Sequence, residues 1–319
     1  MVGTLLAPFQ LPFMARALAE LLLLGLLGAS VGVFVLLRRL AFLADALTHT
    51  VFPGVVIGYL AAGTAGITPG ALLAALGTTA LLTAIVASGR VNRDSALAIL
   101  LTCFFAVGVV LVSRRASYTS DLTAFLFGRP LTVDGTQIAW TAAVTAGVGL
   151  VLLALGKELV FVAFDPAGAA AAGYRPLVLD LVVNTLVALT VVVAIRSVGT
   201  LLVIAIMIIP AATGRALSDR LPVIAAAAGI SGMAAAWVGL GISFRVSLST
   251  HTSLAAGPTV VGVLLILYLA ALGIRAARGA RGRRAAARDD RRDQETQAAQ
   301  ETQAAQETQA GPEAAHAVR

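Results

Sequence analysis

Charge is scarce in this sequence. Only 12% of its 319 residues are Asp, Glu, Lys or Arg, whereas 59% are hydrophobic. A soluble globular domain of average composition has about 25% charged and about 45–50% apolar residues. The few charges gather in short clusters and in the C-terminal tail, which leaves long apolar runs between them. This distribution excludes an ordinary soluble domain and indicates a protein whose main solvent is lipid.

Lysine and cysteine are almost missing. Lys157 is the only lysine, so the net charge of +7 comes from arginine. The arginines stand between apolar segments and are not interleaved with aromatic residues, so we expect no nucleic-acid partner. Cys103 is the only cysteine, which excludes an intramolecular disulfide. The first apolar segment lacks the cleavage site of a secretory signal, and we expect it to be retained.

Sequence motifs of common enzymes are missing too. The three histidines, His49, His251 and His316, form no His-Glu-x-x-His pair, and no Gly-x-Ser-x-Gly elbow occurs. Lys157 follows Gly156, but the other residues of a phosphate-binding loop are not there. We therefore expect no enzymatic activity, and any ATP-driven function would need a separate ATPase subunit.

Apolar runs decide the fold class, because a helix of about 20 apolar residues crosses a bilayer with its backbone groups paired. We expect an all-α, polytopic integral membrane bundle with about nine spans. These spans cover residues 13–37, two stretches between 46 and 89, 95–112, 135–155, 177–195, 198–213, 222–241 and 258–274. Glycine-rich residues 63–70 divide the second run. Eight spans result if the one ending near Pro210 is only partly inserted.

The remaining segments differ from the spans in composition. Residues 113–134 are polar with a short amphipathic piece at 122–127, and residues 157–176 are typical of a loop that carries a short helix. After residue 275 an Arg-rich stretch precedes a Gln-Glu-Thr-Gln-Ala-Ala repeat, which has nothing to bury. We therefore expect a membrane domain, residues 1–275, and a disordered tail, residues 276–319, whose arginines contact anionic lipid headgroups.

Arginine bias orients the spans, because positively charged loops stay in the cytoplasm. With nine spans and an external N-terminus, these clusters alternate onto the cytoplasmic side: Arg38 with Arg39, Arg90 with Arg93, Arg215 with Arg220, and the run from Arg275 onward. Arg114, Arg115 and Arg245 then lie outside, as does the polar loop with His251, which is more typical of a solvated histidine than of a metal ligand. The tail is expected in the cytoplasm.

Asp45 and His49 stand in an apolar segment at the start of an expected span. Their spacing of four places both side chains on one face of a helix. Ionisable residues inside a membrane are costly and usually face a bundle interior or an aqueous path. A carboxylate and an imidazole together suit zinc or manganese. The alternative is that Asp45 caps the helix and His49 forms an ordinary hydrogen bond.

Pro53 adds a backbone feature to this pair. Because Pro has no N–H, it would kink the helix and leave the carbonyl of His49 without a helical partner. Two side chains do not complete a four-coordinate site, so a metal would need a second copy of the chain or water. A partly filled site would suit transport, since the ion must also leave. Two other acids, Glu20 and Asp180, lie close to span ends, where we expect an ordinary interfacial role.

Four segments resemble the permease subunits of ATP-binding-cassette importers for zinc, manganese or iron. Residues 38–54 are similar to that family's arginine and Gly-Asp-x-x-x-His-x-x-x-Pro-Gly block. Residues 121–128 resemble its Leu-Phe-Gly segment, and residues 164–173 its Phe-Asp-Pro-Glu-x-Ala block. Residues 198–213 resemble its late-span signature. The four lie in the family's order within residues 13–275.

The resemblance implies a permease fold like that of vitamin B12 and metal importers, in a bacterial plasma membrane. It implies a homodimer in which paired copies of Asp45 and His49 line a central path, with the divalent metal as transported substrate and no resident cofactor. A cytoplasmic ATP-binding subunit and an extracytoplasmic metal-binding protein are the implied partners. The residues of the implied ATPase-docking helix are Phe164, Asp165, Pro166, Ala170 and Gly173.

Some residues depart from the family pattern. Ala44 stands where many relatives have Gly, and Ala167 and Gly168 stand where Glu is common, so a salt bridge from that Glu to an ATPase is not expected. Without the resemblance, this alanine-rich piece would be a plain connecting helix. Two other functions stay open: a permease for iron chelates, which needs a wider path, and a stand-alone ion-coupled secondary transporter, which would work without an ATPase.

Overall fold

The computed structural model describes residues 7–113, 130–250, 255–280 and 294. Nearly all of these residues are helical and none forms a strand, so the expected all-α fold is confirmed. The chain divides into two compact units, Met1–Leu269 and Ala270–Arg319. The Leu-Phe-Gly segment, its amphipathic piece, His251 and nearly all of the tail beyond residue 280 lie outside the described residues.

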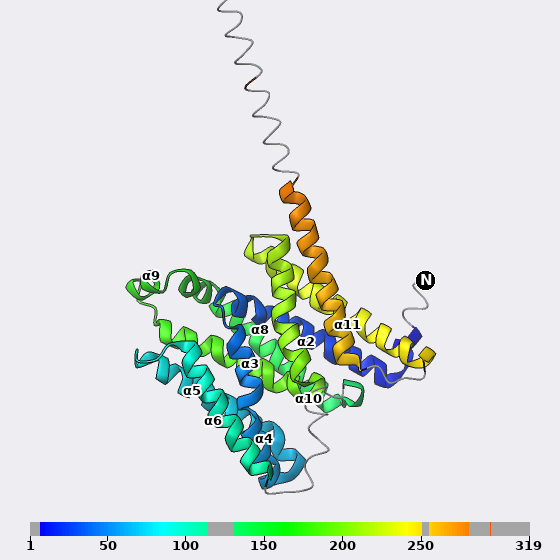
Figure 1. The fold of residues 1–319 in the computed structure, drawn as a ribbon, viewed down its shortest axis with the longest axis horizontal. Helices are drawn as coiled ribbons and strands as arrows, with labels where there is room; N and C mark the ends of the chain where they lie inside the picture. Colours follow the sequence, from blue (N-terminus) through cyan, green and yellow to red (C-terminus); the bar gives the residue numbers. More distant parts are fainter. Residues whose placement is uncertain (1–6, 114–129, 251–254, 281–293, 295–319) are drawn as a thin grey trace, which may run out of the picture. The chain divides into compact units, whose positions relative to one another are not determined.

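Figure 1 labels the helices along the chain. Their bounds are η1 Ala7–Gln10, α2 Pro12–Leu37, α3 Ala41–Thr50, α4 Phe52–Ala62, η2 Gly63–Gly66, α5 Ile67–Ala87, α6 Arg93–Ser113, η4 Pro130–Thr132, α8 Gly135–Phe164, α9 Pro166–Ala171, α10 Pro176–Leu217 and α11 Leu221–Thr250. A last apolar helix covers Ala256–Ala280. Within the described residues, seven helical segments are long and apolar enough to cross a membrane.

Two of these segments are about twice the length that one crossing needs. Ala41–Ala87 has 47 residues and Pro176–Leu217 has 42. The first reverses at Gly63, which has a left-handed φ of 62°. Beyond it α5 returns along α4 so closely that a Cβ on Gly58 would collide with the carbonyl oxygen of Gly66, and one on Gly54 with that of Gly70. The glycine cluster is therefore a helical hairpin, as the sequence predicts.

The second long segment, α10, reverses at Gly199, whose φ of 73° and ψ of 169° interrupt the helix. Before this glycine the chain runs antiparallel to α2, because Asp180 binds Arg38 at the end of α2 and Ser197 binds Glu20 near its start. Beyond the glycine the chain returns along α2, toward the end that holds Arg38.

Contacts of the returning half of α10 fix its direction. Ile206 lies against Gly28, and Ala211 shares a buried cluster with Val33, so the numbers rise together on both helices. This half packs along α2 as a full crossing, which favours nine spans over eight. With both reversals counted, the seven apolar segments supply the nine crossings expected.

Small residues let the central helices approach each other. A Cβ on Gly32 would collide with the carbonyl oxygen of Met207 in α10, and Gly25 of α2 faces Gly232 of α11 at backbone contact. Because lipid is as apolar as the side chains, membrane helices associate through such close packing more than through a hydrophobic driving force. The result is a buried α2 in contact with α8, α10 and α11.

Polar contacts define two ends of the bundle. At the first, which we call the Arg38 end, Asp180 of α10 binds Arg38 and Arg93, and the carbonyl of Leu159 in α8 accepts from Arg38. The opposite end lies around Glu20. The positive-inside rule predicts that the Arg38 end faces the cytoplasm.

The expected loop at residues 157–176 is partly wrong. Helix α8 continues through Lys157 to Phe164, because Leu159 and Val162 are buried against the bundle while the charged head of Lys157 stays exposed. Only then does the short helix α9 follow. Likewise, α11 extends beyond the expected end at residue 241, to Thr250. In both cases the helix is longer than the apolar run that predicts it.

Candidate functional site

Asp45 and His49 lie on the open face of α3. His49 Nε2 is 3.9 Å from Asp45 Oδ1, and the two side chains are 38% and 42% exposed, respectively. Their neighbours Ala44 and Ala46 are fully buried, as is Leu47. Helix α3 thus has one polar face that the described part of the chain leaves partly exposed, and the predicted placement of both side chains on one face is present.

The helix is interrupted next to this pair. Helix α3 ends at Thr50 and α4 begins at Phe52, with Pro53 in its first turn. The N–H of Val51 donates to the carbonyl of Leu47 at 3.2 Å and is also directed at that of His49. The break that Pro53 predicts is therefore present, whereas a ligand role for the His49 carbonyl stays a prediction.

An aromatic ring of α6 borders the imidazole, and a ring of α4 packs against that ring. Phe105 stands edge-on to His49, with ring centroids 5.9 Å apart and an interplanar angle of 85°. The ring centroid of Phe52 lies 6.1 Å from that of Phe105. These contacts limit how the imidazole can turn. Sequence reasoning missed Phe105, since it lies 56 residues away from His49 in the numbering of the chain.

Asp45 and His49 alone do not make a metal cage. No group of three or more His, Cys, Asp or Glu side chains that could hold a metal ion occurs within the part of the chain that is described. Zinc takes four ligands, and manganese favours oxygen and nitrogen ligands in larger number. Within the described residues, Asp45 and His49 therefore amount to a partial site, and it lies on a partly exposed face.

The segment that follows α8 protrudes at the Arg38 end. Asp165 caps α9 by accepting the N–H of Gly168 at 2.8 Å, and Pro166 occupies the first turn. Gly173 ends the segment with a left-handed φ of 90°. Phe164 and Ala170 are exposed, so α9 presents most of its surface outward.

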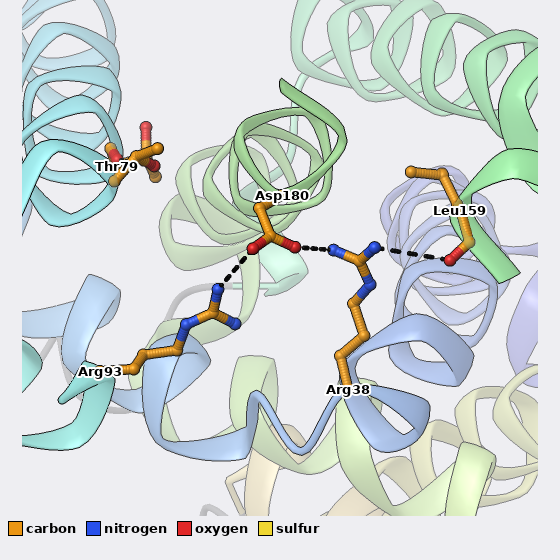
Figure 2. Close-up of polar contacts among 6 residues, drawn as sticks. Arg38, Thr79, Arg93, Leu159 and Asp180 are labelled. Atoms are coloured by element: carbon orange, nitrogen blue, oxygen red, sulfur yellow. Dashed lines mark hydrogen bonds and ion pairs between the residues drawn. The ribbon is translucent and has the colours of Figure 1, made fainter. Parts of the chain in front are cut away.

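Two ion pairs that share Asp180 lie at the same end of the bundle, and Figure 2 shows Asp180 between the two guanidinium groups. Arg93 Nη2 donates to Asp180 Oδ2 at 3.0 Å, and Arg38 Nη1 donates to Oδ1. Arg38 also reaches the carbonyl of Leu159 at 3.5 Å. Burial lowers the pKa of Arg38, while the charge of Asp180 opposes that shift. The carboxylate of Asp180 does more than the ordinary interfacial role expected of it, because it joins separate helices.

Glu20 departs from its expected interfacial role too. Its side chain is fully buried in α2, and its Oε1 accepts hydrogen bonds from Thr141 at 2.8 Å and from Ser197 at 2.5 Å. Gln137 in turn donates to Ser197 at 2.6 Å. This polar network joins α2, α8 and α10 next to the reversal at Gly199.

Comparison with known proteins adds a family to this geometry. The sequence matches the ABC 3 transport family over residues 10–275. The chain belongs to this family.

Relatives of the chain include named transport proteins of bacteria. The manganese transport system membrane protein MntC of Halalkalibacterium halodurans is 32% identical over 242 residues, which cover 76% of this chain and 82% of that protein. A Haemophilus influenzae protein named as a probable iron transport system membrane protein is 29% identical over 250 residues, covering 78% and 91%. Among solved structures, PsaBC from Streptococcus pneumoniae in complex with Fab aligns with a TM-score of 0.73 at 28% identity, over 85% of this chain and 95% of that chain.

Membership of the ABC 3 transport family confirms the resemblance drawn from residues 38–54, 164–173 and 198–213, and with it the polytopic permease fold. The chain is thus a transport component. The ligand roles of Asp45 and His49 and the docking role of α9 stay predictions. Asp180 and Glu20 are what sequence reasoning missed, and the available signal was a lone acid inside an apolar run.

Proposed function

We propose that this chain is the permease subunit of an ATP-driven importer of divalent metal in a bacterial plasma membrane, with manganese as the first candidate substrate. The observation that carries the proposal is the exposed Asp45–His49 pair on α3 of an ABC 3 family chain. Relatives named for manganese transport support manganese, and one named for iron transport keeps iron as a candidate. Zinc suits the same two ligands.

Two copies of the chain would form the path. The pair is open on α3, so a second copy facing it across a two-fold axis would bring two carboxylates and two imidazoles together. Four ligands that are split between two subunits can separate when the subunits move, which lets the metal leave. Alternating access would then follow from rigid-body motion of the two copies.

The partners follow from this arrangement. A cytoplasmic ATP-binding subunit docks on α9 at the Arg38 end and hydrolyses ATP, which the permease does not do. An extracytoplasmic metal-binding protein delivers the ion at the Glu20 end. The C-terminal tail is cytoplasmic, where its arginines meet anionic lipid headgroups.

Uptake by the assembled complex tests the proposal. We expect Asp45→Ala and His49→Ala each to lower manganese uptake into proteoliposomes by at least about tenfold, because each removes ligands from both copies. Asp94→Ala is the matched control, since Asp94 is an exposed carboxylate in the first turn of α6. Assembly with the ATPase, measured by size-exclusion chromatography, should be unchanged in all three variants.

Other outcomes would point elsewhere. Unchanged uptake by both site variants would overturn the site assignment. Uptake that an iron chelate inhibits, and that free manganese and zinc do not inhibit, would indicate a chelate permease. Transport by the purified chain without an ATPase would indicate an ion-coupled secondary transporter.

A further inference from the structure

Asp180 occupies a position between the docking segment and the bundle. It lies in the second turn of α10, and only a short connection separates α10 from α9. That connection is tied back, since the N–H of Tyr174 donates to the carbonyl of Ala169 at 3.0 Å and the Tyr174 ring packs edge-on against Phe161, 6.0 Å between centroids. A displacement of α9 therefore reaches Asp180 through a short, braced piece of chain.

The first partner of Asp180, Arg38, fixes the corner from which α3 starts. Arg38 caps α2, and Arg39 next to it adopts a left-handed φ of 56°, which is uncommon for any residue other than glycine. The N–H of Leu40 donates to the carbonyl of Val35 at 2.8 Å, and α3 begins immediately after it. A pull on the Arg38 guanidinium thus acts on the corner that aims α3 and its Asp45–His49 face.

The second partner, Arg93, is the first residue of α6. Phe105 on the same helix stands edge-on to His49. The carboxylate of Asp180 therefore holds Arg38, at the corner before α3, and Arg93, at the start of α6 (Figure 2). Helix α3 carries the Asp45–His49 pair, and α6 carries the ring beside His49.

Burial separates this ion pair from an ordinary surface contact. The Arg38 side chain is 5% exposed, and those of Asp180 and Arg93 are 26% and 27% exposed. Arg215 and Asp219 offer a contrast, since their side chains are 51% and 81% exposed and the two residues are only four positions apart in the sequence. Exposed pairs of that kind contribute little, whereas a shielded carboxylate that bridges two guanidiniums constrains geometry.

We propose that Asp180, with Arg38 and Arg93, is the link that transmits movement of the docking helix α9 to α3 and α6 and so to the metal site. The three are positioning residues and do not contact the metal. This inference rests on the proposed function, from which it takes the docking role of α9 and the ligand role of Asp45 and His49.

Separate measurement of ATP hydrolysis and uptake in the complete complex tests the link. We expect Asp180→Asn to assemble and to hydrolyse ATP at close to the wild-type rate, while metal uptake falls by about tenfold or more, within the range of typical coupling between sites. Asp180→Glu should restore most of the uptake. Asp219→Asn, in the exposed pair, is the control and should behave as wild type.

A second readout needs no metal. In a Cys103→Ser background, Phe42→Cys places a thiol on the exposed first turn of α3. We expect its rate of modification by a maleimide to differ between the nucleotide-free and ATP-bound complex, and Asp180→Asn to abolish that difference. If Asp180→Asn does not assemble, Arg93→Gln removes one arm of the link and should reduce both the uptake and the labelling difference.

The outcomes separate the two proposals. Wild-type uptake and labelling in Asp180→Asn would overturn the link, as would a loss of uptake in proportion to ATP hydrolysis, which indicates a structural role alone. If the wild-type complex transports no divalent metal but the labelling difference still depends on Asp180, the proposed function fails and the link stands.

Discussion

Glu20 shows how much a single buried acid contributes to a membrane bundle. Removing its carboxylate by Glu20→Ala would leave the hydroxyls of Thr141 and Ser197 buried without their acceptor. Each unsatisfied group costs about 1–3 kcal/mol, so we expect a clearly lower thermal unfolding midpoint in detergent. Glu20→Gln keeps an acceptor oxygen, so its unfolding midpoint should lie between those of the wild type and Glu20→Ala. Asp219→Ala, at an exposed carboxylate, is the control, and an unchanged midpoint for Glu20→Ala would contradict the network.

Residue pairs close in sequence were predictable, and distant pairs were not. The spacing of four between Asp45 and His49 fixes their common face as soon as the helix is assumed. Glu20 and Ser197 meet only after the chain has reversed several times, and Asp180 meets Arg38 in the same way. Local periodicity carries no information about such partners, so their roles had to be seen in the fold.

Glycines in the α4–α5 hairpin offer a test at the scale of the element. A Cβ on Gly58 would collide with the backbone carbonyl of Gly66, which cannot turn away as a side chain could. Gly77 in α5 has open space around it. We expect Gly58→Ala to destabilise the bundle by about 1–3 kcal/mol through overpacking, and Gly77→Ala to be neutral or slightly stabilising through helix propensity. Thermal unfolding in detergent compares them, and equal midpoints would contradict the close hairpin.

Run length predicted the elements well but not their ends. Hydrophobic length places spans because lipid sets the minimum, yet it places no maximum on a helix that continues into the interface. Helix α8 runs on through Lys157 to Phe164, where packing of Leu159 and Val162 against the bundle supports it, and α11 runs on to Thr250. Turn positions were predicted more closely: residues 63–70 predict the first reversal, and the separate spans expected at 177–195 and 198–213 place the second within a few residues of Gly199.

At the scale of the whole molecule, the placement of arginines predicted which loops lie at the same end of the bundle. Arginine clusters predicted as cytoplasmic include Arg38 and Arg93, and both meet at one end of the bundle around Asp180. A single segment does not reveal the direction in which it crosses the membrane, but the arginine bias of all the loops together predicts the direction of every span. The number of copies in the complex could not be predicted in this way, because no sequence pattern within one chain indicates what covers the open face of α3.

Mixed complexes test whether two copies share one site. Differently tagged wild-type chains and Asp45→Ala/His49→Ala chains can be expressed together with the ATPase, and the mixed species isolated by two affinity steps. If the metal needs ligands from both copies, one intact copy offers only the exposed pair seen on α3, and uptake should fall by about tenfold or more, as when ligands are lost from a metal site. Two independent paths would instead leave the mixed complex with half of the wild-type uptake rate, because each chain would then work alone. Complexes that carry both tags but two wild-type copies control for the tags and the purification.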